Sequence, residues 1–453
     1  MKKKKQWKLS TTQIIMLSFI VVILVGSVLL ALPISSATGK AVPYIDAVFT
    51  ATTATCVTGL VTVSTASTWS TFGHIVILIL IQIGGLGVIT MMCAFMMIMN
   101  RKIGIADRML IQDAFNLNTL SGLVKFVRKV LIGTFLIEGL GAILYMFVFV
   151  PEFGLRGIWI SVFNAISAFC NAGMDIIGEN SLCDYATNPL VNIVTSLLIV
   201  LGGIGYIVWW DVLRVLGNKK ILKRKMFHYL TLHSKIALSV TASLIVLGAL
   251  TVFIFEYHNP LTLKNYSLFD KIQLSFFQSV TTRTAGFATI PQQNLTNPTS
   301  FVCLFLMFIG GSPVGTAGGI KTVTIAILAL STIASVRGKN EVTIFDRDLS
   351  REAVGKATAV CGMSFFIMLT STLFLSAVTN ASAMDIMFET VSATATVGLT
   401  RNLTPFLSFW GKWMIIVNMY LGRVGPISLA IAFNMKKKSE NIIKNPTEKI
   451  SVG

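Results

Sequence analysis

The chain has 453 residues, of which 54% are hydrophobic and only 12% are charged. This composition excludes an ordinary water-soluble protein, because so few charges could not keep such long apolar runs in solution. The formal net charge of +18 raises the question of nucleic-acid binding, which the positions of the Lys and Arg residues answer below.

Apolar stretches long enough to cross a hydrocarbon core of roughly 30 Å, at about 20 residues each, recur along the whole chain. They lie near Ile14–Leu32, Ile75–Met99, Val130–Val150, Leu190–Val212, Ile236–Phe255, Phe301–Ile333, Val360–Val378 and Trp413–Phe433. These eight predicted spans place both termini on the same side of the membrane. The apolar run that follows Lys2–Lys5 is longer than that of a typical signal peptide, so we interpret it as an uncleaved first span.

The basic residues are strongly segregated, since 28 of the 37 Lys and Arg fall in five segments. These segments are the residues before Thr11, Asn100–Val130, Asp211–Ile236, Ser335–Ala357 and the residues after Asn434. All five lie on one side of an eight-span topology, which the positive-inside rule assigns to the cytoplasm. The charge bias therefore predicts a multi-pass protein of the cell membrane with both termini cytoplasmic, and no nucleic-acid partner.

Each outer connection between paired spans contains a short amphipathic segment and then a small, hydroxyl-rich stretch with a glycine. We call these stretches the glycine loops, and their glycines are separated by 114, 113 and 112 residues. The loops comprise Thr55, Cys56, Val57, Thr58 and Gly59; Cys170, Asn171, Ala172 and Gly173; Thr284, Ala285 and Gly286; and Thr396, Val397 and Gly398. A period this steady indicates an internal repeat.

A second glycine mark recurs inside the span that follows each loop. It comprises Gly84, Gly85 and Gly87; Gly202, Gly203 and Gly205; Gly310 and Gly311; and Gly422 and Gly425. The two marks in phase predict an all-α membrane protein, with four parallel helix–pore loop–helix repeats and eight transmembrane helices around one central pore. The expected divisions are a basic N-terminus over residues 1–10, repeats over 11–100, 101–218, 219–336 and 337–434, and a basic tail over 435–453.

Four short helices should precede the glycine loops and direct their partially negative C-terminal ends toward the ring centre, where they favour a cation. We expect these pore helices near Ile45–Thr55, Trp159–Ala168, Ile272–Thr281 and Met384–Thr394. Non-helical backbone at membrane depth can replace an ion's hydration shell with carbonyl oxygens. Glycine permits the positive φ that such a loop needs. The fifteen loop residues are therefore the predicted selectivity filter, with K⁺ held at Gly59, Gly173, Gly286 and Gly398.

The third inner span differs from the others because five glycines and a proline fall within ten residues, which a continuous helix would not tolerate. The predicted gate is made of Gly310, Gly311, Ser312, Pro313, Gly315, Thr316, Ala317, Gly318 and Gly319. We expect a break here below the filter. The alternative is an inert kink. For the glycines of the first two inner spans, ordinary helix packing is the simpler interpretation.

Charges within the membrane are costly and usually functional. Arg423 lies at the glycine mark of the fourth inner span, so we expect it to face the pore and to pair with gate carbonyls or set a barrier to cations. Snorkelling to an interface is the alternative. Arg283, in the third glycine loop, should brace that loop with Glu389 as a possible buried partner, and Lys321 is predicted to be an interfacial anchor.

The glycine loops, the interrupted third inner span and Arg423 together resemble the Trk/Ktr/HKT superfamily of potassium transporters, over about Thr11 to Phe433. The resemblance rests on Thr-Ala-Thr-Cys-Val-Thr-Gly-Leu, Asn-Ala-Gly, Thr-Thr-Arg-Thr-Ala-Gly-Phe and Thr-Val-Gly-Leu. Chain length and the lack of extra N-terminal spans are similar to the bacterial Ktr branch. In this superfamily a serine in the first loop marks a sodium-permeable plant subgroup, so Gly59 at that position implies potassium.

The resemblance further implies a homodimer with one pore per subunit and a cytoplasmic ring of nucleotide-binding regulatory subunits. It also implies potassium uptake, with sodium dependence or symport open. The chain itself contains no GxGxxG motif and no cofactor motif. Basic segments such as Lys219–Lys225 and the tail beyond Met435 could dock the ring, or could equally serve as topology determinants that contact membrane lipids.

Two other classes of function are less compatible with the sequence. A membrane enzyme would need a nucleophile, base or metal cluster, yet the four histidines are scattered and no HExxH or GxSxG motif occurs. An alternating-access transporter would be expected to have inverted repeats. The parallel period favours channel-like permeation without excluding coupling to sodium or voltage.

Overall fold

The computed structural model describes residues 10–99, 101, 103–115, 122–218, 225–339 and 341–425. Most of the predicted basic N-terminus, most of the Lys219–Lys225 linker and the whole predicted basic tail therefore lie outside the described residues. The C-terminal part of the eighth predicted span, beyond Gly425, lies outside them too.

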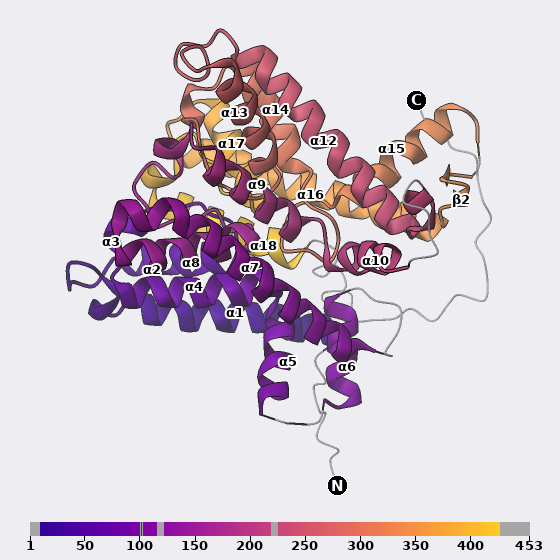
Figure 1. Cartoon of the computed structure of the whole chain (residues 1–453), viewed down its shortest axis with the longest axis horizontal. Coiled ribbons are helices and arrows are strands. Elements are labelled where there is room, and N and C mark those ends of the chain that lie inside the picture. The colour runs from indigo at the N-terminus through magenta and orange to yellow at the C-terminus, as the bar shows by residue number, and fades with distance from the viewer. Residues whose placement is uncertain are drawn as a thin grey trace.

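The described chain is almost entirely helical (Figure 1). Its longer helices are α1 (Thr11–Leu30), α2 (Tyr44–Cys56), α4 (Thr71–Leu86), α5 (Val88–Ile98), α6 (Ile105–Ala114), α7 (Leu123–Phe153), α8 (Leu155–Cys170), α9 (Pro189–Gly203), α10 (Tyr206–Leu216), α12 (Leu232–Glu256), α13 (Leu268–Thr281), α14 (Asn297–Phe308), α15 (Thr322–Val336), α16 (Arg351–Val378), α17 (Ala383–Ala395) and α18 (Phe409–Val424). Short elements are α3 (Thr65–Thr68), α11 (Met226–Tyr229), four 3₁₀ turns, and an antiparallel pair of strands, β1 (Thr343–Ile344) and β2 (Arg347–Asp348).

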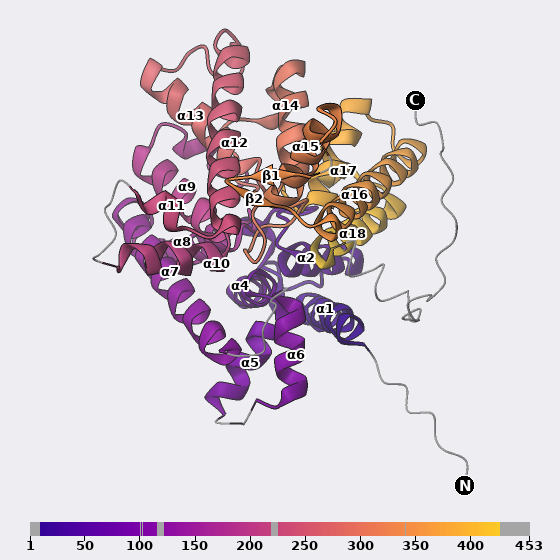
Figure 2. The same ribbon diagram turned by 90° about the vertical axis from the view of Figure 1, so that its right-hand side faces the viewer.

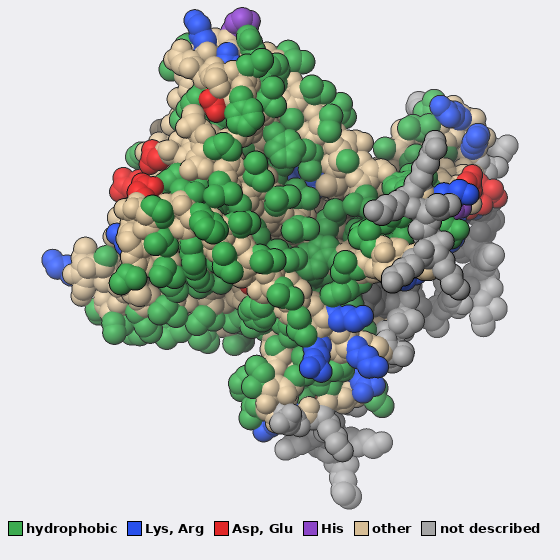
Figure 3. All heavy atoms as spheres, in the orientation of Figure 1, with side chains coloured by type: hydrophobic (Ala, Val, Ile, Leu, Met, Phe, Trp, Pro, Cys, Tyr) green, Lys and Arg blue, Asp and Glu red, His purple; other side chains and the backbone are tan. Residues whose placement is uncertain are grey.

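Four helices, α1, α7, α12 and α16, are individually long and apolar enough to cross a membrane. Side-chain caps begin three of them: Ser10 caps α1, Thr231 caps α12 and Ser350 caps α16. Much of their surface is exposed and apolar, as expected of helices that face lipid. Figure 3 shows the resulting broad hydrophobic surface, with basic side chains gathered over the region of α5, α6 and the start of α7.

The four predicted short helices are present as α2, α8, α13 and α17, and each extends slightly beyond its predicted bounds. Their C-terminal halves are almost wholly buried, including the hydroxyl groups of Thr53, Ser167 and Ser392. The last residue of each short helix lies no more than three residues from the first predicted residue of the glycine loop that follows. The structure thus places all four glycine loops inside the protein.

The first and second inner spans, predicted near Ile75–Met99 and Leu190–Val212, are each bent in the structure. α4 and α5 meet at Gly87 with a bend of 103°, and α9 and α10 meet near Gly205 with a bend of 98°. α18 ends at Gly425. Gly87, Gly205 and Gly425 have almost the same backbone conformation, with φ of 87°, 92° and 86°, which a residue with a Cβ atom rarely adopts. The third inner span is interrupted between Phe308 and Thr322, as predicted.

Each inner helix also packs on the short helix of the next set along the chain. α4 contacts α8, α9 contacts α13, α14 contacts α17, and α18 contacts α2. The last contact joins the end of the described chain to its beginning, so the four sets of helices form a closed ring (Figures 1 and 2). An ion pair strengthens this closure, because Lys412 Nζ of α18 lies 2.6 Å from Asp46 Oδ1 of α2.

Candidate functional site: four glycine loops above a hydrogen-bonded segment

The four glycine loops share one backbone conformation. Each has a left-handed residue two positions before its glycine, and the glycine itself has a positive φ. The left-handed residues are Val57 (φ 54°), Asn171 (58°), Thr284 (68°) and Thr396 (52°), and the glycines are Gly59 (99°), Gly173 (63°), Gly286 (85°) and Gly398 (94°). The same two-residue pattern in four separate loops indicates that they serve one common purpose.

The four glycines also meet in space. A Cβ atom built on Gly59 would lie 3.3 Å from the Cα atoms of both Gly173 and Gly398 and 2.6 Å from the Ala172 carbonyl oxygen. A Cβ atom on Gly286 would lie 3.1 Å from the Cα atom of Gly173 and 3.2 Å from that of Gly398. The loops therefore approach one another so closely that only glycine fits without displacement of a neighbouring backbone.

Hydroxyl groups of the short helices hold the loops in this shape. Thr53 Oγ1 accepts a hydrogen bond from the Gly59 amide at 2.9 Å, and Ser392 Oγ accepts one from the Gly398 amide at 3.0 Å. Ser167 Oγ plays the same part in the second loop, where it accepts from the Met174 amide at 3.1 Å. All three residues stand six positions before their glycine. The loop hydroxyls of Thr55, Thr58, Thr284 and Thr396 are buried and make no hydrogen bond.

A cavity of about 420 Å³ opens above the loops, and all four glycines line it. Two acidic side chains from the segment after the second loop, Asp175 and Glu179, line the same cavity. Burial raises the pKa of the Asp175 carboxyl to about 6, although hydrogen bonds from Ile177, Ser181 and Gly178 oppose the rise. Sequence reasoning missed both acids. Their position shortly after Gly173 was the signal that could have placed them next to the glycine loops.

Beneath the loops, the segment Gly310–Gly319 crosses the protein without regular structure. Its ends pair through the Gly310 amide and the Ile320 carbonyl oxygen, 2.8 Å apart. The Ser312 amide donates to the Gly203 carbonyl oxygen at 2.8 Å, and the Thr316 amide donates to that of Gly202 at 3.1 Å. The segment is thereby hydrogen-bonded to the bend between α9 and α10, and it contains all nine predicted gate residues other than Arg423.

Arg423 joins this segment to the opposite side of the ring. Its guanidinium group donates to the Thr316 carbonyl oxygen and to the carbonyl oxygens of Gly84 and Gly85, the last at 3.2 Å. The structure thus brings Arg423 together with a predicted gate carbonyl, and the side chain does not snorkel to an interface.

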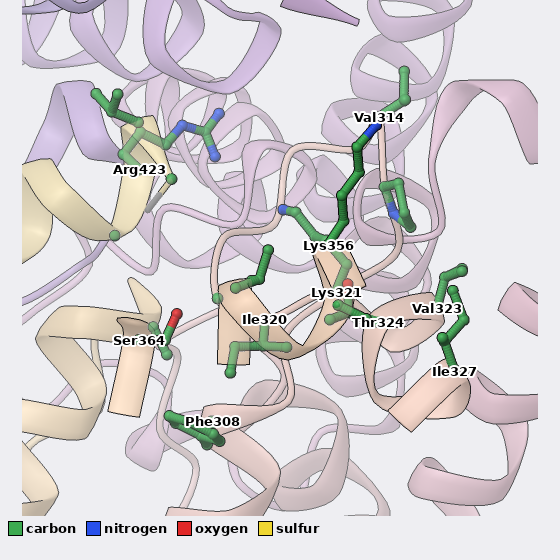
Figure 4. A pocket seen from close by; sticks show the side chains of 18 of the residues that line it. Phe308, Val314, Ile320, Lys321, Val323, Thr324, Ile327, Lys356, Ser364 and Arg423 are labelled. Carbon is green, nitrogen blue, oxygen red and sulfur yellow. The ribbon is translucent and has the colours of Figure 1, made fainter. Parts of the chain in front are cut away.

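A second cavity, of about 760 Å³, is lined in part by Pro313, Val314 and Gly319 of this segment, and Figure 4 shows side chains around it. Following the predicted topology, we call it the inner cavity and the first one the outer cavity. Arg423 and Lys321 line the inner cavity, with apolar side chains such as Phe308 and Ile327. The prediction that Lys321 is an interfacial anchor is wrong, because its Nζ atom donates to the Ala317 carbonyl oxygen at 2.6 Å. A second carbonyl oxygen of the same loop, that of Gly318, lies 3.5 Å from the ammonium group, so the loop backbone supplies acceptors that draw the side chain inward.

The predicted pairing of Arg283 with Glu389 is also wrong. Arg283 Nη1 donates to the Thr241 carbonyl oxygen of α12 at 3.1 Å, and its side chain is buried away from the glycines. Glu389 instead accepts hydrogen bonds from Thr404 and from Thr400, the latter at 2.7 Å. Each charged group therefore braces its own repeat.

One more buried carboxylate escaped sequence reasoning. Glu138 is the sole charged residue of the apolar stretch Val130–Val150, and it is only 4% exposed within α7. Its carboxylate accepts hydrogen bonds from Gln82 of α4. Its isolation among apolar residues was the signal that should have identified it. No group of three or more His, Cys, Asp or Glu able to hold a metal ion occurs among the described residues.

These features define a helical membrane protein in which four backbone loops meet between an outer cavity and an inner one. The chain belongs to the TrkH family of cation transport proteins, because the family model described as "Cation transport protein" matches residues 2–445. Membership in this family excludes the enzyme alternative.

Relatives of similar length support the assignment. The chain is 40% identical to Ktr system potassium uptake protein B of Bacillus subtilis (strain 168), over 97% of this chain and 96% of the relative. It is also 40% identical to the potassium/sodium uptake protein NtpJ of Enterococcus hirae, over 100% of this chain and 99% of the relative. The crystal structure of the potassium transporter TrkH from Vibrio parahaemolyticus has the same fold, with a TM-score of 0.75 and 17% identity over 95% of this chain and 86% of that one.

Proposed function

We propose that this chain takes up potassium ions across the cell membrane through a single pore that four helix–pore loop–helix repeats surround. The observation that carries the proposal is the meeting of Gly59, Gly173, Gly286 and Gly398 at the floor of the outer cavity. The closed ring of contacts among the four sets of helices supports the same arrangement. The names of the relatives, which refer to potassium uptake, support the choice of ion.

The fifteen residues of the glycine loops act as the selectivity filter. Four short helices end at the start of the loops, so the partially negative ends of their dipoles stabilise a cation there. Loop carbonyl oxygens replace water around the ion. The buried hydroxyls of Thr55, Thr58, Thr284 and Thr396 lack hydrogen-bond partners, and they are further oxygen atoms that could orient toward the ion or toward water next to it. Asp175 and Glu179 raise the local cation concentration at the outer entrance.

The Gly310–Gly319 segment acts as the gate, and Arg423 holds it closed. Residues of the segment line the inner cavity, and the Arg423 bonds to Thr316, Gly84 and Gly85 connect three parts of the ring beneath the filter. A guanidinium group on the ion path also repels cations by charge alone. Opening the path thus requires the loss of hydrogen bonds together with displacement of a positive charge.

The chain acts as the pore subunit of a Ktr-type complex. The names of three relatives refer to a Ktr system, and the described residues include no separate soluble domain that could sense a nucleotide. A homodimer of this chain on a cytoplasmic ring of nucleotide-binding subunits accounts for both points.

Growth of an uptake-deficient bacterial strain at low external potassium tests the proposal. The strain should grow when it expresses this chain, and growth should improve further when a candidate nucleotide-binding subunit is co-expressed. Parallel measurements of ⁸⁶Rb⁺ and ²²Na⁺ entry, with and without sodium in the medium, identify the transported ion and any coupling. Entry of sodium without rubidium would contradict the proposed selectivity.

A further inference from the structure

Glu138 is an unusual residue for its position. It lies in the middle of α7, far from both helix ends, and its side chain is only 4% exposed. A carboxyl group at this depth is costly unless it has partners, and it usually has a functional role. None of the four ion pairs found among the described residues includes Glu138.

The hydrogen-bond partners of Glu138 come from two other elements. Both carboxylate oxygens lie 3.2 Å from Gln82 Nε2 of α4, and Cys170 Sγ at the end of α8 lies 3.8 Å from Oε1. Gln82 Oε1 in turn lies 3.7 Å from Cys170 Sγ. The three side chains therefore form a closed triangle that fixes the end of α4 against the end of α8.

Both of those helix ends are connected to Arg423 by hydrogen bonds, the end of α4 directly and the end of α8 through Thr316. Gly84 and Gly85, whose carbonyl oxygens accept from Arg423, follow Gln82 within one helical turn. On the other side, Phe169 precedes Cys170, and its carbonyl oxygen accepts a hydrogen bond from Thr316 Oγ1 at 3.1 Å. Thr316 is the residue whose own carbonyl oxygen completes the Arg423 contacts.

A continuous circuit of hydrogen bonds and short backbone steps follows from these contacts. It runs from Glu138 through Gln82 to the carbonyl oxygens of Gly84 and Gly85, through Arg423 to Thr316, and through Phe169 and Cys170 back to Glu138. Gly85 is closely packed within it, since a Cβ atom there would lie 2.5 Å from Cys170 Sγ. Loss of one member should displace the acceptors on which Arg423 depends.

We infer that Glu138 is a positioning residue for the gate: it holds the ends of α4 and α8 so that Arg423 can bond to both α4 and the Gly310–Gly319 segment at once. The inference rests on the proposed gate, which it extends to the outer helix α7. Glu138 acts through neutral hydrogen-bond partners, the Gln82 amide and the Cys170 thiol, so its effect should depend on hydrogen bonding and shape and not on charge.

The test uses the purified full chain in proteoliposomes, with basal ⁸⁶Rb⁺ flux as the readout and no regulatory partner present. Arg423→Ala should raise basal flux several-fold. Glu138→Ala should raise it in the same direction, whereas Glu138→Gln should retain most of the parent's low flux, because its amide oxygen can still accept from Gln82 and from Cys170. Gln82→Leu, which removes the other side of the triangle at similar volume, should match Glu138→Ala and provides a second variant if the first folds poorly.

The decisive measurement is the double variant Glu138→Ala/Arg423→Ala. Its flux should equal that of Arg423→Ala alone within about twofold, because residues in one network do not contribute independently. The matched control is Tyr145→Phe, which removes a buried 2.6 Å hydrogen bond to Thr195 between α7 and α9, outside the circuit. Alone, it should leave basal flux at the level of the parent protein. Combined with Arg423→Ala, it should leave flux at the level of Arg423→Ala.

Three outcomes would overturn the inference. If the fluxes of the single variants multiply in the double variant, Glu138 does not act through Arg423, although the proposed gate stands. If Glu138→Gln leaks as much as Glu138→Ala, charge and not hydrogen bonding is what matters. If Arg423→Ala leaves flux unchanged, the proposed gate and the inference fail together, while the filter remains testable by ion selectivity.

Discussion

At the scale of single residues, the glycine loops combine strain with close contact. Val57, Thr284 and Thr396 are β-branched and yet left-handed, a conformation that costs on the order of 1–3 kcal/mol each unless the surroundings impose it. The hydrogen bonds to Thr53 and Ser392 and the burial of the short helices supply that constraint. The loop backbone is therefore held in place by the protein itself, as the proposed selective coordination of an ion requires.

Gly286→Ser should reduce discrimination between potassium and sodium by about tenfold, equivalent to 1.4 kcal/mol. Its φ of 85° and the Val397 carbonyl oxygen at 2.6 Å from a Cβ atom both oppose a side chain, so the loop must shift. The measurement is the ratio of ⁸⁶Rb⁺ to ²²Na⁺ flux. Gly362→Ala on α16, where a Cβ atom meets nothing within 4 Å, is the control, and an unchanged ratio in Gly286→Ser would contradict the filter.

Asp175 should make uptake depend on external pH. Its pKa is raised to about 6, so above that pH the carboxylate is ionised and attracts cations into the outer cavity, and below it the group is neutral. Initial rates of uptake at low potassium should fall a few-fold as external pH decreases through about 6. Asp175→Asn should lower the rate at neutral pH and flatten this profile, and a variant that keeps the parent's pH dependence would exclude Asp175 as its source.

At the scale of secondary structure elements, the bends in the inner helices are the main finding that the sequence did not predict. Gly87 and Gly205 lie in apolar runs long enough to span, and glycine is common in membrane helices that are straight. Three residues before each bend, a glycine packs against another element: Gly84 lies against the Thr55 carbonyl group and Gly202 against that of Phe169. The packing role predicted for Gly84 and Gly202 is therefore confirmed. The bends at Gly87 and Gly205 are a further feature that the sequence did not predict.

Contact between α18 and α2 closes the ring, and the ion pair of Lys412 with Asp46 should stabilise it. Their side chains are only 16% and 8% exposed, so Lys412→Met leaves a buried charge unpaired and should lower the free energy of unfolding by about 3–5 kcal/mol. Adding Asp46→Asn should recover part of the loss. Thermal unfolding of the detergent-purified protein measures both.

Lys356→Met is the matched control for that pair, because it breaks the exposed pair with Glu352 on α16. It should not change thermal stability measurably, since exposed pairs contribute little. If Lys412→Met also left thermal stability unchanged, the contact between α18 and α2 would not depend on the ion pair.

At the scale of the whole molecule, each chain contains its own closed ring and needs no second copy to complete the proposed pore. A homodimer would then serve as the platform for regulatory subunits. Native mass spectrometry of the purified protein should give about twice the chain mass of 49.3 kDa. A protein that is monomeric under these conditions would contradict the proposed assembly.

The sequence alone determined the membrane environment, the period of the glycine loops, the four short helices and the interrupted third inner span. These follow from local rules, since apolar length, glycine and proline each restrict the backbone wherever they occur. Only the tertiary structure decided which charged group meets which: Arg283 with Thr241, Lys321 with Ala317, and Glu138 with Gln82. Arg283 and Glu138 have their partners on other helices, tens of residues away in the sequence. Lys321 has its partner within a loop whose shape the neighbouring elements impose. In both cases the packing of the elements brings the groups together. The glycine pattern was thus readable from the chain, whereas the network around Arg423 emerged only from the assembled ring.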